Sequence, residues 1–274
     1  MNVLGLGKGG CAIADLFSKY PEYKVFKADV GIKGKNCLII PQCSSIEQYE
    51  EKLPEFKQLS KLKGETLFVI CGGGNISGAT LKLLEQVKHT EITILYIRPD
   101  PNLISAEIAM KDKVTFGILQ EFTRSGLFKK MILISNSQVE NLLGGLSVME
   151  YYDSLNKVIV STLHMANYLL TANNVFGKMS AERDLDRIST IGIVNNEDGT
   201  ESYLYNLDSP RQKIFLYAIK ESDLTTNKEL IKMIQQQTRS SYSGTELDIS
   251  YKITTTNYES NFVYIISNTN IIQQ

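Results

Sequence analysis

The sequence has little of what marks secreted, metal-binding or membrane proteins. It contains 4 cysteines and 2 histidines in 274 residues. The cysteines form no C-x-x-C pair, and the two histidines complete no ligand set for a structural zinc ion. Sparse, scattered cysteines are typical of reduced thiols in a cytoplasmic protein, so we expect that compartment.

Signal peptides, membrane spans and strong charge are also missing. The first residues, MNVLGLGKGG, lack the basic start and apolar stretch of a signal peptide. No run approaches the roughly 20 apolar residues that a helix needs to cross a bilayer. Lys and Arg number 29 against 30 for Asp and Glu, so no net field favours anionic partners. We expect neither a membrane partner nor direct contact with nucleic acid.

The first half of the chain alternates short apolar runs with helical patterns. This alternation predicts an α/β fold, with a Rossmann-like parallel sheet covered by helices on both faces. The expected strands are 3–6, 23–28, 37–40, 66–71, 92–97 and 131–135, and the expected helices are 12–20, 46–61, 79–88 and 116–125. Residues 1–146 would form this first domain.

The second half follows a different pattern. Apolar residues recur every three or four positions over 147–171, which predicts a central helix of about seven turns. Residues 147–187 would be this helix and the loop after it. Residues 188–274 would form a small α+β domain. Its expected elements are strands 187–194 and 201–207 around a turn at 196–199, strand 213–219, helix 227–239, and a closing antiparallel pair, 247–255 and 262–267.

A first glycine-rich loop lies between a predicted strand and a predicted helix. Gly5, Gly7 and Gly10 satisfy G-x-G-x-x-G, and Asp29 ends the next strand. Glycines let the backbone approach an anion, and the N–H groups of a helix start favour one. Lys8 adds a positive charge. Alone, the motif is equally that of an NAD(P)-dependent oxidoreductase, and its glycines also suit plain strand–helix packing.

A second glycine-rich loop, GGGNISG at residues 72–78, follows the buried strand 66–71. Three successive glycines at a strand end leave N–H groups free to surround an anion. Asn75 and Ser77 add polar side chains, and Ser77 suits a helix cap. We expect no gain in packing to explain these glycines. The P-loop pattern is absent, and two phosphate-binding loops together predict a nucleoside di- or triphosphate.

These motifs resemble those of the tubulin/FtsZ superfamily. GGGNISG is similar to the GGGTGTG of that family, with Asn75 and Ser77 where threonines usually stand and Ile76 in place of a glycine. Ile97-Arg98-Pro99 resembles its T-R-P strand end, and the runs 116–121 and 132–136 resemble a helix and strand that follow in the same order. The resemblance covers about residues 1–190. In size the chain resembles the plasmid and bacteriophage tubulin-like proteins.

The resemblance implies GTP or GDP, with Mg²⁺, as the ligand. The residues that would hold its phosphates are Gly7, Lys8, Gly9, Gly10 and Cys11 on one side and Gly72, Gly73, Gly74, Asn75, Ile76, Ser77 and Gly78 on the other. No side chain is assigned to the metal.

Two residues on the long helix would hold the guanine base. Tyr152 and Asn156 are four residues apart and share a helix face, so a ring can stack on a purine while an amide contacts its edge. Spacing alone fits a half-buried tyrosine and a solvated asparagine equally well. Asn136 is a further polar candidate near the base, or simply a turn former.

The family carries an N-x-D-x-x-D/E motif after its central helix, which reaches the nucleotide of the next subunit. Residues 172–187 do not match it cleanly. Glu182, Asp184 and Asp186 are the candidate catalytic acids, and Asp186 aligns best; alternatively, these acids cap the next segment or pair with Arg183 and Arg187. The resemblance implies a GTPase that assembles head to tail into filaments, with a non-hydrolysing structural homologue as the alternative.

Overall fold

The computed structural model describes residues 1–181, 183–240 and 247–274. The chain forms two compact units, Met1–Val160 and Ser161–Gln274, called here the N-terminal and the C-terminal unit. The division falls inside the long helix α6 (Tyr151–Thr171). Among the described residues, no helix is both long enough and apolar enough to span a bilayer.

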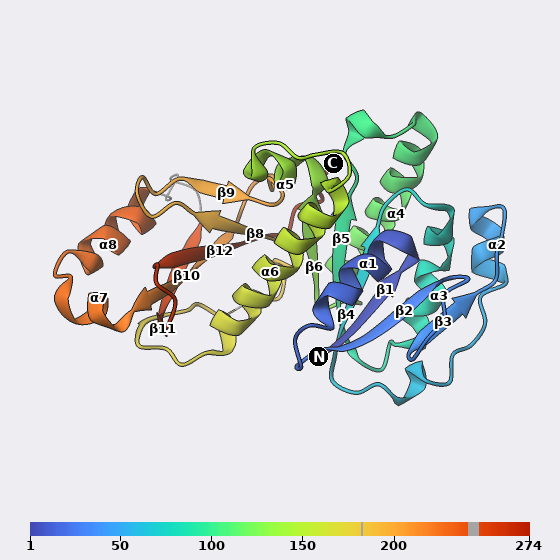
Figure 1. The fold of residues 1–274 in the computed structure, drawn as a ribbon, viewed down its shortest axis with the longest axis horizontal. Coiled ribbons are helices and arrows are strands. Elements are labelled where there is room, and N and C mark those ends of the chain that lie inside the picture. Colours follow the sequence, from blue (N-terminus) through green and yellow to red (C-terminus); the bar gives the residue numbers. More distant parts are fainter. Residues whose placement is uncertain (182, 241–246) are drawn as a thin grey trace. The chain divides into compact units, whose positions relative to one another are not determined.

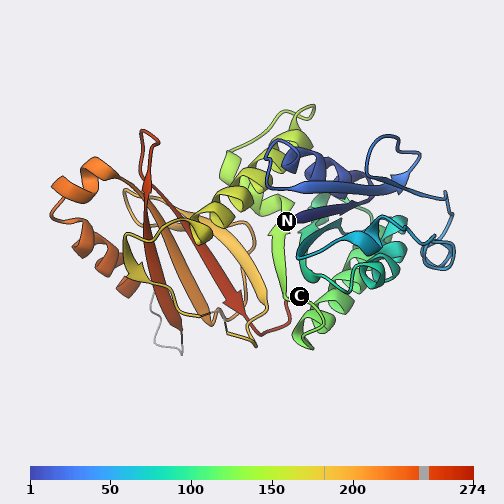
Figure 2. The ribbon, with the colours of Figure 1, turned by 90° about the horizontal axis from the view of Figure 1, so that it is seen from below.

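The N-terminal unit is built on a parallel sheet. Its neighbouring strands run in the order β3-β2-β1-β4-β5-β6, and every pair is parallel. Helices lie on both faces of this sheet (Figures 1 and 2). The strands are β1 (Asn2–Leu6), β2 (Lys24–Val30), β3 (Cys37–Ile40), β4 (Glu65–Cys71), β5 (Glu91–Arg98) and β6 (Lys130–Ser135). This parallel sheet with its helices confirms the predicted α/β class. Helices are needed there because parallel sheets are stable mainly when both faces are covered.

The helices of the N-terminal unit differ in detail from the expected ones. They are α1 (Gly7–Phe17), α2 (Ile46–Glu51), α3 (Thr80–Gln86), α4 (Ala106–Arg124) and α5 (Asn136–Leu143), with 3-10 turns η1 (Leu59–Lys61), η2 (Asn75–Ala79) and η3 (Pro101–Leu103). The expected helix 46–61 was wrong, since Pro54 lacks an N–H and cannot continue α2. The start expected at 116 was also wrong: α4 begins at Ala106 because the Ser105 hydroxyl accepts a hydrogen bond from Ile108 N–H.

In its described residues, the C-terminal unit combines a mixed sheet with helices α7 (Glu221–Thr226) and α8 (Leu230–Ser240) and the second half of α6. Its strands are β7 (Phe176–Lys178), β8 (Ile188–Val194), β9 (Glu201–Tyr203), β10 (Gln212–Lys220), β11 (Asp248–Thr256) and β12 (Phe262–Thr269). The expected pairing of the last two strands was wrong. Strand β10 lies between them, parallel to β11 and antiparallel to β12, and the long strands of this sheet are orange and red in Figure 2. β10 is buried along nearly its whole length, which favours a central place.

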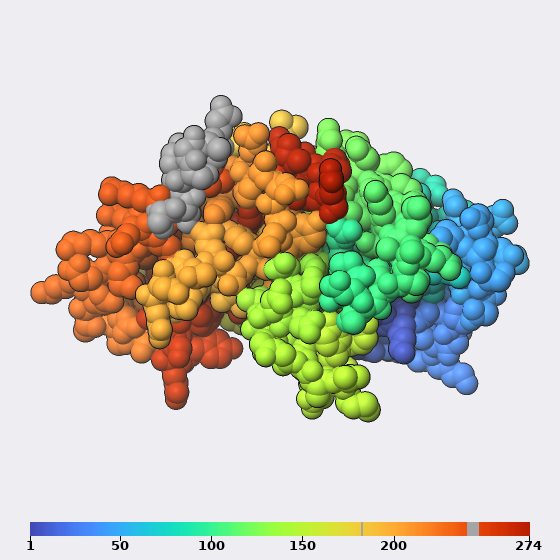
Figure 3. Space-filling model, turned by 90° about the horizontal axis from the view of Figure 1, so that it is seen from above, coloured from blue at the N-terminus to red at the C-terminus, as the bar shows by residue number. Residues whose placement is uncertain are grey.

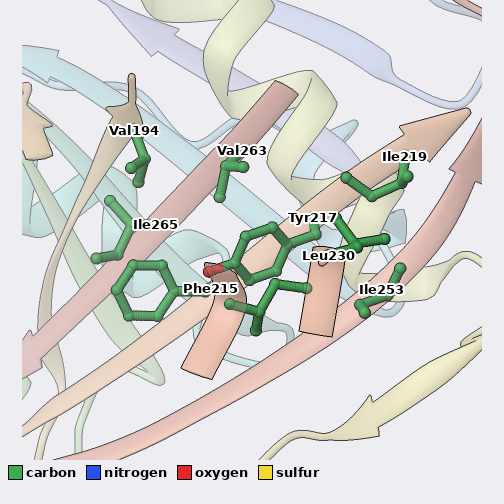
Figure 4. Packing of buried hydrophobic residues seen from close by; sticks show 9 residues of the cluster. Val194, Phe215, Tyr217, Ile219, Leu230, Ile253, Val263 and Ile265 are labelled. Carbon is green, nitrogen blue, oxygen red and sulfur yellow. The ribbon is translucent and has the colours of Figure 1, made fainter. Parts of the chain in front are cut away.

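Helix α8 covers one face of this sheet. Leu230 and Ile234 of α8 belong to one buried cluster with Phe215 and Tyr217 of β10 (Figure 4). Because side chains alternate along a strand, Ile253 of β11 joins this cluster while its neighbour Lys252 points to the opposite face.

Candidate phosphate-binding site

The two glycine-rich loops meet at the carboxyl ends of two adjacent parallel strands. The first follows β1 and the second follows β4, and β1 and β4 are hydrogen-bonded to each other. The chain order reverses at this point of the sheet, where open α/β sheets bind their ligands. A Cβ atom added to Gly7 would lie 2.8 Å from Cγ2 of Ile76. The loops are therefore in direct contact.

The first loop presents an uncapped helix start. Helix α1 begins at Gly7, and Leu6 at its cap position offers no side-chain acceptor to the first N–H groups. The first turn of α1 contains no acidic side chain, and Lys8 there is exposed. The N–H groups of Gly7 to Gly10 have no acceptor within the helix, so this end is suited to an anion.

Other glycines of the first loop are fixed by packing. A Cβ atom on Gly5 would lie 2.2 Å from the Gly10 oxygen, and one on Gly10 would lie 2.6 Å from the Val69 oxygen. The Cys11 thiol is 3.5 Å from the oxygen of Gly5 and 3.6 Å from that of Ala28, and burial raises its pKa to about 12. The Cys11 side chain thus packs against the sheet, and only its backbone belongs to the loop.

Three glycines of the second loop are also required by packing. A Cβ atom added to Gly72 would lie 1.7 Å from Oδ1 of Asp112, and one added to Gly73 would lie 2.4 Å from Ile108. A Cβ atom added to Gly78 would lie 2.1 Å from the Ile46 oxygen. The expectation that these glycines gain nothing from packing was therefore wrong for all three. They allow helices α4 and α2 to approach the loop.

Gly74 is different. The nearest atom to a Cβ placed there is Cγ2 of Ile76, at an ordinary contact distance of 3.7 Å. Its backbone is extended, with φ −78° and ψ 149°, a conformation open to any residue. Within the described residues, neither Gly73 nor Gly74 donates a backbone hydrogen bond, whereas Gly72 N–H donates to the Ile97 oxygen. Protein packing does not explain a glycine at position 74.

The two polar side chains of the second loop are engaged within the protein. The Asn75 amide donates to the Ser44 oxygen at 3.3 Å, and Nζ of Lys111 lies 2.6 Å from Oδ1 of Asn75. Lys111 also pairs with Glu107, one turn earlier on α4. Lys111 thereby brings a positive charge to the loop, which motif spacing did not reveal.

The predicted cap role of Ser77 was wrong. Gly74 stands at the cap position of η2 and Ala79 at that of α3. Ser77 is buried, and its oxygen accepts a hydrogen bond from the Thr115 hydroxyl at 3.4 Å. This serine fastens the loop to α4.

A buried polar network lies directly beneath the second loop. The Tyr96 hydroxyl donates to Oδ1 of Asp112 at 2.8 Å, and Nε and Nη2 of Arg98 donate to Oδ2 at 3.3 and 3.2 Å. Arg98 also lies over the ring of Phe116, 4.4 Å from its centroid. Burial raises the pKa of Asp112, although Tyr96 and Arg98 act in the opposite direction. The network supports the loop through Gly72.

The candidate base-holding residues come from the start of α6 and the start of α5. Tyr152 is 63% exposed and meets Tyr151 edge to face, with ring centroids 5.1 Å apart. The Tyr151 hydroxyl donates to Glu140 of α5 at 2.9 Å. The half-buried amides of Asn136 and Asn156 make no hydrogen bond within the described residues, so both are available to a ligand.

The loop between α5 and α6 protrudes next to these residues. It is the yellow-green segment that stands out from the surface in Figure 3. Val148 and Met149 at its end are each 92% exposed. Gly144 and Gly145 precede them with φ of 72° and 109°, which lets the chain turn sharply after α5.

The candidate acids differ in accessibility. Asp186 is 3% exposed and lies 3.4 Å from Nε of Arg183, and burial raises its pKa. Asp184 is exposed. Glu182 lies outside the described residues. Asp186 thus pairs with Arg183, one of the alternatives that the sequence left open. Of the two described candidate acids, Asp184 is the one that faces solvent.

No protein-family model matches the sequence, and no curated protein sequence matches it. Solved structures do. A protofilament of TubZ from Bacillus thuringiensis serovar israelensis in its GTPγS form has a TM-score of 0.75 at 14% identity, over 99% of this chain and 87% of that one. The GTPγS-bound protofilament of CetZ2 from Haloferax volcanii has a TM-score of 0.69 at 12% identity, over 97% and 92%. An empty FtsZ dimer from M. jannaschii has a TM-score of 0.62 at 13% identity, over 98% and 87%.

The chain has the tubulin/FtsZ fold. The fold expected from the resemblance is thereby confirmed over the whole chain, beyond the 1–190 range of the sequence motifs. In this chain, both glycine-rich loops lie at the carboxyl ends of neighbouring strands of the N-terminal sheet. Identities of 12 to 14% carry the fold alone, so the ligand has to be argued from this chain's own residues.

Proposed function

We propose that this protein binds GTP at the two glycine-rich loops, assembles head to tail into filaments, and hydrolyses GTP where subunits meet. The observation that carries the proposal is the glycine at position 74. It has space for a side chain, an extended backbone and an unused N–H group, so a ligand that approaches the backbone closely is the remaining reason for it.

The phosphate chain would lie between the two loops. The uncapped N–H groups of α1 would hold it on one side, and the N–H groups of Gly73 and Gly74 on the other. Lys8 and Lys111 would supply positive charge. Among the described residues, no three His, Cys, Asp or Glu side chains form a metal-binding group. Phosphate oxygens would be the main ligands of the proposed Mg²⁺, as is usual for this ion at nucleotide sites.

The base would be held from α6 and α5. Tyr152 offers an exposed ring for stacking, and the unpaired amides of Asn156 and Asn136 offer both a donor and an acceptor. An amide oxygen would accept from N1–H and the 2-amino group of guanine, whereas adenine presents an acceptor at N1 and has no 2-amino group. We therefore expect GTP to bind in preference to ATP.

Assembly and hydrolysis would depend on each other. TubZ and CetZ2, which share the fold, were solved as protofilaments, and head-to-tail contacts extend without closing. Of the two described candidate acids, Asp184 is exposed and Asp186 is buried, so Asp184 is the one that would approach a nucleotide on another copy. An acid placed beside the attacking water contributes roughly 10²–10⁴-fold to the rate.

Light scattering, electron microscopy and phosphate release test this proposal together. The purified chain is mixed with GTP, GDP or a non-hydrolysable GTP analogue. We expect filaments with GTP and the analogue, and phosphate release that rises more steeply than protein concentration. Filaments without phosphate release would instead support a structural homologue that does not hydrolyse GTP. No filament with any guanine nucleotide would refute the assembly proposal.

A further inference from the structure

A buried lysine closes the end of the long helix. Lys252 of β11 is 4% exposed. Its Nζ donates hydrogen bonds to the backbone oxygens of Leu170 at 3.0 Å and Ala172 at 2.5 Å. These oxygens belong to the last turn of α6 and to the residue that follows it. Within the described residues, Lys252 has no carboxylate within ion-pair distance.

Burying the Lys252 ammonium costs free energy unless a partner compensates its charge. Burial lowers the pKa of Lys252, as expected for a cation removed from water. The carboxyl end of a helix carries partial negative charge and unpaired C=O groups. The last turn of α6 has no basic side chain of its own. Lys252 supplies the missing cation from another element.

The segment after α6 is fixed to the same strand. Gly177 of β7 lies opposite Lys252 in the antiparallel register. Gly177 has φ +94°, and a Cβ there would lie 2.6 Å from the Tyr251 oxygen, so only glycine fits. Val175 N–H donates to the Ile253 oxygen at 2.8 Å. The chain therefore leaves α6 and runs directly along β11.

Two further hydrogen bonds continue the attachment toward the exposed acid. The Ser180 hydroxyl donates to Oδ1 of Asp248 at 3.0 Å, and Nε2 of Gln212 donates to the Ala181 oxygen at 3.0 Å. Asp184 follows within three residues of Ala181. Side chains of β10 and β11 thus hold the path from the end of α6 as far as Ala181.

We propose that Lys252 is a positioning residue for GTP hydrolysis. It holds the carboxyl end of α6 against β11, so that the segment leading to Asp184 leaves the helix in one direction. This inference rests on the proposed function, since it gives Lys252 an effect on turnover. It acts through position and not by touching the nucleotide.

Lys252→Met tests the inference, because methionine retains an unbranched stem and removes the ammonium. Lys213→Met is the matched control. Lys213 lies on the neighbouring strand β10, is 13% exposed in its side chain, and pairs with Glu201 at 2.6 Å. Lys213→Met removes the same ammonium group, but within the described residues Lys213 makes no hydrogen bond to α6. Lys252→Arg retains a cation with several N–H donors.

Two readouts on the full chain are needed. In hydrogen exchange, amides of residues 172–181 are expected to exchange faster in Lys252→Met than in Lys213→Met. In steady-state assays with assembled protein, Lys252→Met is expected to lower kcat about 10- to 100-fold, because a displacement of about 1 Å can cost that much. The KM for GTP should stay within about twofold. Lys252→Arg should recover most of the lost turnover.

The inference is overturned if Lys252→Met matches Lys213→Met in both exchange and kcat. It is also overturned if KM rises while kcat holds, since that pattern places the effect on binding. Failure of the proposed function is seen separately, in a wild-type protein that releases no phosphate. The exchange comparison then decides alone: faster exchange at 172–181 supports the role of Lys252 in holding the segment, and unchanged exchange overturns it.

Discussion

Alanine at two glycines of the second loop should have opposite effects. A Cβ on Gly72 would lie 1.7 Å from Oδ1 of Asp112 and 2.5 Å from the Tyr96 hydroxyl. Overpacking of this kind costs about 1–3 kcal/mol, and breaking a buried charged pair costs about 3–5 kcal/mol. Partial relaxation of the network reduces the sum. Gly72→Ala should therefore lower the free energy of unfolding by about 2–4 kcal/mol.

Gly74→Ala is the matched substitution two residues later. The added Cβ meets only Ile76, at 3.7 Å, and the backbone conformation suits alanine. Replacing glycine at such a position reduces the entropy of the unfolded chain and stabilises by about 0.4–1 kcal/mol. If phosphate approaches this backbone, the same methyl group should weaken GTP binding at least tenfold. Stability and affinity should thus change in opposite directions.

Urea unfolding followed by far-ultraviolet circular dichroism measures the stability of both variants. The chain has no tryptophan, so this signal is preferable to tryptophan fluorescence. Equal m-values for the variants and the wild type would show that the same unfolding transition is compared. Wild-type stability of Gly72→Ala would refute the packing of Asp112 beneath the loop. Unchanged GTP affinity of Gly74→Ala would refute the reading of Gly74 as a ligand-facing glycine.

Three further predictions concern charged side chains. Arg98→Lys loses the paired donation to Asp112, so urea unfolding should show a loss of about 1–3 kcal/mol; wild-type stability would contradict it. Lys111→Met should raise the Kd for GTP about tenfold while leaving guanosine binding unchanged in calorimetry, because only the phosphates would meet Lys111; equal losses for both ligands would count against that. Burial raises the pKa of Asp186, so its stabilising contribution is present below the unfolded pKa of about 3.9 and is lost as pH rises through the folded pKa. The stability of Asp186→Asn relative to wild type should therefore be higher at about pH 7 than at about pH 4.5, and a difference independent of pH would show that Asp186 does not titrate as described.

The strands of the N-terminal unit could be predicted because their signal is local. Short apolar runs between turn-forming residues indicate strands, and the expected strands 37–40 and 66–71 lie within one residue of β3 and β4. The helix expected over 46–61 ends at Glu51, and the signal for this end is also local. Pro54 marks the end of α2 in the sequence itself.

The supports of the site could not be predicted in the same way. Lys111 and Asn75 are 36 residues apart, and Lys252 and Leu170 are 82 apart. No periodicity brings such pairs together. Asp112 was missed for a related reason: the helix was expected to begin at 116, which left Asp112 in a loop. The glycines show a related limit, because the motif alone did not reveal that packing requires Gly72, Gly73 and Gly78.

The central claim is that both loops hold the phosphates of one guanine nucleotide. Isothermal titration calorimetry of the full chain with GTP, ATP and NADH tests it most directly. We expect one GTP per chain, and no comparable heat from ATP or NADH. Tight NADH binding with no response to GTP would contradict the claim. It would instead favour an NAD(P)-dependent oxidoreductase that uses Gly5, Gly7, Gly10 and Asp29.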